Sequence, residues 1–362
     1  MNKVGSISVL HVIFLSMTVI GLKNHVTIIP SILNVAGRDS WITVIASFFA
    51  ILPWVFLLAF INKKTNGEPL VEWLDRSLGN TISSVVRYTI AIFLLILAVF
   101  TLGETLYWIS ATFLPETPIV LMLIIYSVLC ILLASTNLQT IVMVNAFVLF
   151  WVVIFGFFVA FTNLQVKDYN LLRPFFEHGL QPVMTSMVYP ASGYVELLMF
   201  LFIQHKVKKP LKWYHFTIML FIIMGLTLGP TSGAITEFGP DEATKQRFPA
   251  YEEWSLVSLG RLIDHMDFLS IYQWLTGAFI RGAVILYVAA DLLKMTGDRK
   301  RIWRILAPPF FFMNAVLILL NDRIFLAIKG QYLLIATFVF MILLSLLLTI
   351  IALRSKKASK KV

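Results

Sequence analysis

The sequence predicts an all-helical membrane protein that crosses the bilayer many times. Of its 362 residues 59% are hydrophobic, only 13% are charged, and the mean hydropathy is +0.86. A soluble core does not need so much apolar surface. The apolar residues also fall into runs long enough to span about 30 Å of hydrocarbon at roughly 20 residues per helix. The chain, residues 1–362, is therefore expected to form a single transmembrane domain.

The first half of the chain contains five apolar runs. The first, residues 8–33, follows a single lysine and continues past a polar interruption. Because a small-residue cleavage site is missing after its apolar part, we expect a retained membrane helix and not a signal peptide. The other four are uninterrupted apolar stretches between polar or Pro-containing connections, at residues 41–61, 85–113, 119–133 and 140–162.

The second half contains five more runs, which gives ten predicted helices. They lie at residues 184–203, 216–230, 269–293, 302–320 and 332–353. The connection at 168–182 is too apolar for a solvated loop and is expected to pack on the outer face. The longest outer loop is expected at 231–265. After Pro249 its apolar and charged residues alternate as in a short interfacial helix that caps the outer mouth or only covers the helix ends.

Loop charge predicts the orientation. If the N-terminus is cytoplasmic, most of the 29 Lys and Arg residues fall on the inner side, including those of the basic tail 354–362. The positive-inside rule therefore favours cytoplasmic positions for both termini, as an even number of helices requires. The same bias, with attraction to anionic lipid headgroups, explains the net charge of +10 without nucleic acid as a partner.

Two predicted helices are interrupted by helix-breaking and charged residues. The first is broken at 21–25 and the sixth at 189–196, where Pro190, Gly193 and Glu196 lie close together. Breaks at membrane depth are tolerated where they line a polar cavity. Five helices separate the two breaks, so halves at about 8–162 and 184–353 would enter the membrane from opposite sides. This arrangement predicts an inverted repeat whose breaks meet at a ligand cavity, with open backbone at 191–193 as the main contact.

The polar groups at membrane depth point to binding and not to catalysis. The sequence has neither nucleophile and phosphate-binding motifs nor histidines at metal-ligand spacing, so we expect no enzyme, no metal and no cofactor. Buried charges such as Lys23, Glu196 and Arg281 are costly and functional by default. Glu196 would alternatively serve as a structural ion-pair partner of Arg281 or Lys23. Glu104 would alternatively extend to the headgroups. A cavity with both charges could hold a zwitterion.

Several short motifs, in order, resemble one family. They are Pro30 with 37–41, the segments 172–179 and 193–196, the pairs 238–239 and 248–249, and 267–269 with Trp274. On these residues the chain resembles the B subunits of Ger-type germinant receptors of spore-forming bacteria, within the amino acid, polyamine and organocation transporter superfamily. The resemblance covers most of the chain and implies a LeuT-like fold of five plus five helices, with helices 1 and 6 discontinuous.

The resemblance also implies a function, partners and a site. It implies a nutrient sensor in the spore inner membrane that assembles with an A subunit and a C lipoprotein. The ligand would be a small germinant, usually an amino acid and sometimes a sugar or nucleoside. Carried over by position, the ligand-binding residues would be Gly21, Leu22, Lys23, Asn24, Gly103, Tyr107, Ala191, Ser192, Gly193, Glu196, Thr276, Ile280 and Tyr287. Lys23 departs from the small residues that classical permeases have at this break, so its side chain would either fill the site or bind the anion.

Three functional readings follow from this sequence. A germinant receptor would couple binding to a conformational signal in partner subunits, which is the reading we favour. A proton-coupled amino acid permease would show gradient-driven uptake, with Glu196 as a candidate proton carrier. An ion channel subunit would need a continuous polar pore, which helices with so few charges do not favour for a single chain.

Overall fold

The computed structural model describes residues 7–258 and 266–354, and these residues are almost entirely helical. The elements of the first half are α1 (Val9–Leu22), η1 (Lys23–Thr27), α2 (Ile29–Ala36), η2 (Gly37–Asp39), α3 (Ser40–Lys64), α4 (Leu70–Leu78), α5 (Asn80–Thr112), α6 (Ile119–Ala134), α7 (Leu138–Thr162) and η3 (Asn163–Gln165). Between residues 169 and 255 the elements are η4 (Tyr169–Leu172), α8 (Leu180–Ser186), α9 (Val188–Tyr194), η5 (Val195–Leu201), η6 (Gln204–Lys206), α10 (Trp213–Phe238), α11 (Pro240–Lys245) and α12 (Pro249–Ser255). The remainder are α13 (Phe268–Leu292), α14 (Arg299–Arg301), η7 (Ile302–Leu306), α15 (Ala307–Ile318), α16 (Asp322–Ala327), η8 (Ile328–Leu333) and α17 (Leu334–Arg354).

The helices form a polytopic membrane bundle. Eight helical stretches in the described part of the chain are long and apolar enough to cross a membrane. Two of the ten predicted helices fall outside these criteria. The fourth, α6, is apolar but has only 16 residues. The sixth is divided into α8, α9 and η5.

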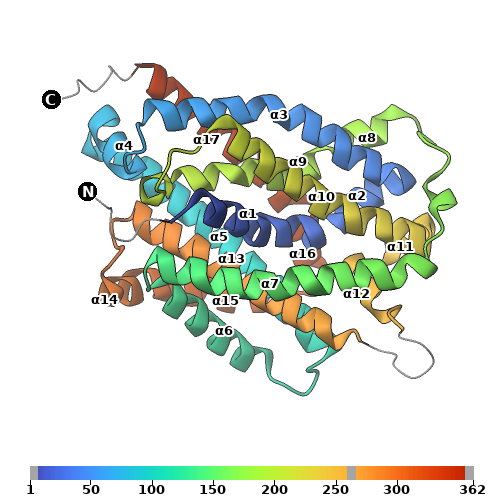
Figure 1. The fold of residues 1–362 in the computed structure, drawn as a ribbon. Helices are drawn as coiled ribbons and strands as arrows, with labels where there is room; N and C mark the ends of the chain where they lie inside the picture. Colours follow the sequence, from blue (N-terminus) through green and yellow to red (C-terminus); the bar gives the residue numbers. More distant parts are fainter. Residues whose placement is uncertain (1–6, 259–265, 355–362) are drawn as a thin grey trace.

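α13 is the central helix of the bundle. Of the most apolar 18 residues of α13, 78% are buried inside the protein, whereas the corresponding fraction is 28% for the helical stretch that contains α7. It packs against α1, α5, α6 and α7, and Figure 1 shows it passing through the middle of the bundle. α1 begins and α17 ends at the end of the bundle where α4 and α14 lie, and α8, α11 and α12 lie at the opposite end. We call these the α4 end and the α12 end.

The predicted outer loop begins later than expected. α10 continues through Pro230 to Phe238, and Gly239 at φ 80° ends it. Pro230 has no N–H to donate to the Leu226 carbonyl four residues earlier, and this carbonyl instead lies 2.9 Å from His25 Nδ1 of η1. The short helix predicted after Pro249 is present as α12. The rest of the predicted loop, 259–265, lies outside the described residues, as do residues 355–362 of the predicted basic tail.

The two predicted breaks are changes of helix type. The first is a π-helical turn, η1, that continues α1, and the second is the 3₁₀ segment η5 that continues α9. The expectation of open backbone at 191–193 is wrong, because these residues are helical within α9. Pro190 lies in the first turn of α9, where its missing N–H costs little. π and 3₁₀ turns nevertheless redirect side chains, and here they turn Lys23 and Glu196 toward the interior.

Asp75 of α4 connects the two halves of the chain at the α4 end. It forms ion pairs with Arg87 of α5 at 3.5 Å and with Lys294, which follows α13, at 2.6 Å. Partial burial opposes ionisation, but hydrogen bonds from Lys294 and Ser83 and the charge of Arg87 hold the pKa of Asp75 below its ordinary value. The carboxylate therefore stabilises the fold above the unfolded-state pKa of about 3.9, and this contribution is lost as pH falls through the lower folded-state value.

We expect Asp75→Asn to lower the unfolding free energy at pH 7 by about 1 kcal/mol, because partly exposed pairs contribute little each. Thermal unfolding of the purified protein at pH 7 and pH 3 measures the effect. The variant and the wild type should converge at pH 3. A constant difference at both pH values would show that the charge of Asp75 does not contribute.

Candidate functional site

A fully buried ion-pair cluster joins the two predicted breaks. Glu196 of η5 has no exposed surface and lies between Lys23 of η1 and Arg281 of α13. Lys23 Nζ is 2.9 Å from Glu196 Oε1, and Arg281 Nη1 is 2.7 Å from Glu196 Oε2. We call Lys23, Glu196 and Arg281 the charge triad. Both cations that the sequence offers as ion-pair partners of Glu196 contact its carboxylate.

Backbone groups also hold the triad cations in place. Lys23 Nζ donates to the Ser192 carbonyl at 3.1 Å, and Arg281 donates to the Val19 carbonyl of α1. Arg281 Nε donates to Thr101 Oγ1 of α5 at 3.0 Å. Carbonyls near the ends of regular helical segments keep unused acceptor capacity, which suits an ammonium or guanidinium group. The triad therefore ties together α1, η1, α5, α9, η5 and α13.

A second buried pair lies beside the triad. Glu104 of α5 forms an ion pair with Lys329 of η8, and Glu104 Oε2 accepts a hydrogen bond from Thr27 of η1 at 2.8 Å. Glu104 and Lys329 are 4% exposed each, so the predicted extension of Glu104 to the headgroups is wrong. Lys329 lies in the connection between the predicted helices 302–320 and 332–353, where the sequence leads us to expect a loop lysine. The π-helical turn η8 instead turns its side chain inward, where Nζ also lies 4.9 Å from the ring centre of Phe248.

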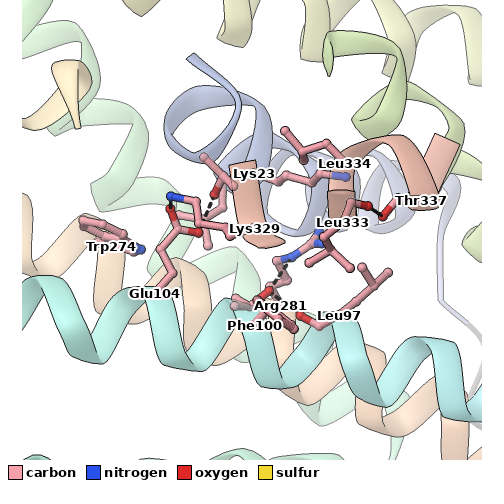
Figure 2. Close-up of a pocket in the computed structure, with 13 residues that line it drawn as sticks. Lys23, Leu97, Phe100, Glu104, Trp274, Arg281, Lys329, Leu333, Leu334 and Thr337 are labelled. Atoms are coloured by element: carbon pink, nitrogen blue, oxygen red, sulfur yellow. Dashed lines mark hydrogen bonds and ion pairs between the residues drawn. The ribbon is translucent and has the colours of Figure 1, made fainter. Parts of the chain in front are cut away.

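The two charge clusters face one small cavity of about 30 Å³. Figure 2 shows Lys23, Arg281, Glu104 and Lys329 around it, with Trp274 at one side. The full lining is Leu22, Lys23, Thr27, Leu97, Phe100, Thr101, Glu104, Trp274, Arg281, Lys329, Leu333, Leu334 and Thr337. Since a site for one water needs about 10–15 Å³, this volume suits two or three water-sized groups and not a whole amino acid.

Asn24 and Gly193 bring the two breaks into direct contact. Asn24 Nδ2 donates to Thr227 Oγ1 of α10 at 3.1 Å and approaches the Pro190 carbonyl at 3.4 Å. A Cβ added at Gly193 would overlap Asn24 Oδ1 and lie 2.6 Å from Asn24 Cγ. Only glycine permits this approach. His25 lies beside this contact as a satisfied polar residue, with Nδ1 2.9 Å from the Leu226 carbonyl.

The structure brings together some of the predicted ligand-binding residues and separates others. Leu22 and Lys23 line the cavity, Glu196 lies directly behind it, and Ser192 and Asn24 support it. Four more are packing residues, because Gly21 faces Leu226, Gly103 faces Leu317, Ala191 lies in the main core, and Ile280 is fully buried in that core. Tyr107 donates to backbone carbonyls of the last turn of α15, and Thr276 donates to the Tyr272 carbonyl on its own helix.

Tyr287 lines a different cavity. This second cavity, of about 840 Å³, lies at the α4 end, where His205 and Lys206 of η6 and the loops at 66–69 and 135–137 also face it. Tyr287 is six residues beyond Arg281 on α13, or about 9 Å along the helix axis at 1.5 Å per residue. Between Arg281 and Tyr287, α13 carries the buried core residues Ala283, Val284, Ile285 and Leu286.

Four aromatic rings pack together on the α12 side of the small cavity, and Trp274 of this group lines it. Trp274 stacks on Tyr251 of α12 with ring centres 4.3 Å apart and lies tilted against Trp108 of α5 at the same distance. Phe248 packs on Trp274 at 4.6 Å. Such pairs contribute about 0.5–1.5 kcal/mol each beyond the area they bury. We call Trp108, Phe248, Tyr251 and Trp274 the aromatic lid. α12 supplies part of it, as the predicted capping helix would.

Glu253 holds α12 against the bundle. Its carboxyl lies over Gly233 of α10, where a Cβ would approach Oε1 to 2.6 Å, and its backbone carbonyl accepts from Asn163 Nδ2 at 2.7 Å. Burial, and then the neighbouring Glu237 carboxylate, raise the pKa of Glu253 well above its ordinary value. Docking of α12 therefore weakens as pH rises from the ordinary Glu value of about 4.3 toward the raised folded-state pKa.

We expect Glu253→Gln to remove this pH dependence, since glutamine imitates the neutral acid. Hydrogen exchange of 239–255, measured at pH 5.5 and pH 8, tests the expectation. Exchange should rise with pH more in the wild type than in the variant, once the intrinsic pH effect is corrected with an unfolded reference. An equal pH response in both proteins would contradict the role given to the Glu253 proton.

A family model matches most of the chain. The model described as spore germination protein matches residues 6–323. The chain belongs to the spore germination protein family. Across 281 residues it is 42% identical to spore germination protein XB of Bacillus anthracis, covering 78% of this chain and 79% of that protein.

More distant members of the spore germination protein family also match. Spore germination protein A2 of Bacillus subtilis (strain 168) is 25% identical over 269 residues, and this alignment covers 71% of each chain. The putative spore germination protein YfkT of the same organism is 24% identical over 271 residues, covering 74% of this chain and 73% of that protein. The relatives named here are germination proteins and not enzymes by name.

Proposed function

We propose that this chain is the B subunit of a germinant receptor and binds a small germinant, most simply an amino acid, between η1 and η5. The observation that carries the proposal is the buried charge triad, which joins two helices exactly where their helical geometry changes. Family membership supports the role in germination. Charges buried at this depth are expensive, and a ligand site is the usual reason for keeping them.

The proposed setting follows the family resemblance. The receptor would lie in the spore inner membrane and combine this chain with an A subunit and a C lipoprotein. Both termini would be cytoplasmic, with the α4 end inward, as the loop charges indicate. The start of α1 and the end of α17 at one end of the bundle agree with this topology.

The proposed mechanism is a population shift. Both carboxylate oxygens of Glu196 are bound to cations, and the cavity is too small for an amino acid. A germinant would therefore stabilise a second arrangement in which η1 and η5 separate and the triad opens. Only a difference in affinity between the two arrangements can drive the change. The movement would reach the partner subunits through the outer surfaces of the same helices.

Spores whose sole receptor contains this chain provide the test. We expect them to germinate with at least one compound in a panel of single amino acids, sugars and nucleosides. Spores that lack the chain but retain the other subunits should not respond. If spores with normal amounts of all three subunits respond to none of these compounds, the receptor proposal is wrong.

A permease is the second candidate, and the cavity at the α4 end favours it. A cavity of about 840 Å³ lined by Tyr287, which lies about 9 Å from Arg281 along the α13 axis, resembles an inner vestibule of a transport path. Liposomes containing the purified protein should then accumulate an amino acid when a proton gradient is imposed. Uptake that collapses with the gradient would favour the permease. Glu196 is a poor proton carrier here, because protonation would break its contacts with both cations.

A further inference from the structure

The walls of the small cavity carry an excess of positive charge. Its charged lining residues are Lys23, Arg281, Lys329 and Glu104. Glu196 lies behind the wall, where Lys23 and Arg281 bind both of its oxygens. Of the charged groups that act on Lys23, only Glu196 and Glu104 are acidic in the described part of the chain. Three cations thus face two carboxylates, and one positive charge lacks a counter-charge.

The same three cations have N–H groups to spare. Lys23 Nζ uses two of its three donors, on Ser192 O and Glu196 Oε1. Arg281 Nη2 makes one hydrogen bond, to Glu196 Oε1, and has a second N–H. Lys329 Nζ contacts Glu104 Oε1 and the face of the Phe248 ring. Unused donors from η1, α13 and η8 therefore converge on one cavity.

The size and surroundings of the cavity restrict what can supply the missing charge. At about 30 Å³ it suits a monatomic anion or a single carboxylate group. The hydroxyl-bearing side chains of Thr27, Thr101 and Thr337 also line it. A buried cation without a partner is strongly destabilising. A bound monovalent anion would give the cluster three negative charges to match its three positive charges. A cationic ligand without a carboxylate would add to the imbalance.

We infer that this cavity is a binding site for one monovalent anion, coordinated by Lys23, Arg281 and Lys329. A free halide and the carboxylate of a ligand share this chemistry. The second source rests on the proposed function, because it makes the site the place where a germinant carboxylate is recognised. In that case Lys23 binds the anion itself, and Glu104 is the available partner for a ligand ammonium group.

Thermal unfolding of the full-length protein in lipid nanodiscs, followed by tryptophan fluorescence, tests the inference. Sodium chloride and sodium formate are compared with sodium sulfate at equal ionic strength. We expect chloride or formate to raise the unfolding temperature by roughly 2–4 °C in a saturable way, since a ligand that binds the folded state stabilises it. A response to formate alone assigns the site to carboxylates, and a response to chloride alone assigns it to halides.

Two variants and one control decide whether the response belongs to this cavity. Lys23→Met leaves Arg281 paired with Glu196 and reduces the cluster to two cations and two carboxylates, so it should abolish the anion response. Lys329→Met gives the same balance of two cations and two carboxylates, and it is used in place of Lys23→Met if Lys23→Met does not fold. Lys209→Met removes an exposed lysine and should respond like the wild type. Equal unfolding temperatures in all three salts, or a full response in both cavity variants, would overturn the inference. Failure of the germination assay would leave this result unaffected, so the two proposals fail separately.

Discussion

Replacing Glu196 with glutamine is expected to destabilise the protein more than any other single change at the site. The carboxylate is fully buried and balances Lys23 and Arg281 at 2.9 and 2.7 Å. Glutamine keeps the shape and leaves two neighbouring cations without their anion. Removing one partner of a buried pair costs about 3–5 kcal/mol. Thermal unfolding of purified protein, with protein amounts in spore membranes as a second readout, measures the loss.

A double variant separates charge from packing. Lys23→Met combined with Glu196→Gln removes one of the two unbalanced cations, so it should recover part of the stability lost in Glu196→Gln. The recovery is the coupling between the two residues, which a double-mutant cycle isolates. If Glu196→Gln alone stays within 1 kcal/mol of the wild type, the triad does not hold η1, η5 and α13 together.

Gly193→Ala is expected to weaken the germination response strongly while leaving much of the fold intact. The added methyl group would overlap Asn24 Oδ1 and force the Asn24 side chain away from Thr227 and the Pro190 carbonyl. This displacement separates η1 from α9 at the proposed site. We expect the germinant concentration for half-maximal germination to rise at least tenfold. Spores that lack other receptors provide the measurement.

Gly225→Ala is the matched control for Gly193→Ala. It lies in α10, and a Cβ there meets no atom within 4 Å. Alanine within a helix should even add up to about 1 kcal/mol of stability. Germination should therefore stay at the wild-type level in Gly225→Ala. An unchanged response in Gly193→Ala, at normal protein amounts, would show that the contact between Asn24 and Gly193 is not part of the site.

The helical membrane class could be predicted because it depends on the length and composition of apolar runs. The exact ends of the helices could not. Pro230 suggested the end of a helix, yet α10 continues to Phe238, and the Leu226 carbonyl that the proline leaves without an N–H partner faces His25 Nδ1 at 2.9 Å. Likewise Pro190 and Gly193 suggested open backbone, whereas proline in the first turn of α9 and close packing on Asn24 keep the segment helical.

The site could be predicted only in part. Lys23, Glu196 and Arg281 are charges inside apolar runs, which is a local signal that a sequence displays. Lys329 was missed because it follows a polar connection and resembles an ordinary loop lysine. Its burial depends on the π-helical turn η8 and on Glu104, which is 225 positions away in the chain. Tyr287 belongs to the set of residues that the family resemblance implies, but it lines the cavity at the α4 end and not the small cavity beside the triad.

The most direct test of the central claim is to measure amino acid binding to a variant in which a larger side chain fills the small cavity. Thr337→Leu places a larger side chain in the cavity wall, and Thr349→Leu makes the same change three turns further along α17. Each threonine donates its hydroxyl to the backbone carbonyl four residues earlier, so both variants lose the same kind of contact. Equilibrium binding of the twenty amino acids to purified protein should show a ligand that binds wild type and Thr349→Leu alike and Thr337→Leu at least tenfold more weakly. Equal binding by all three proteins would contradict a germinant site at this cavity.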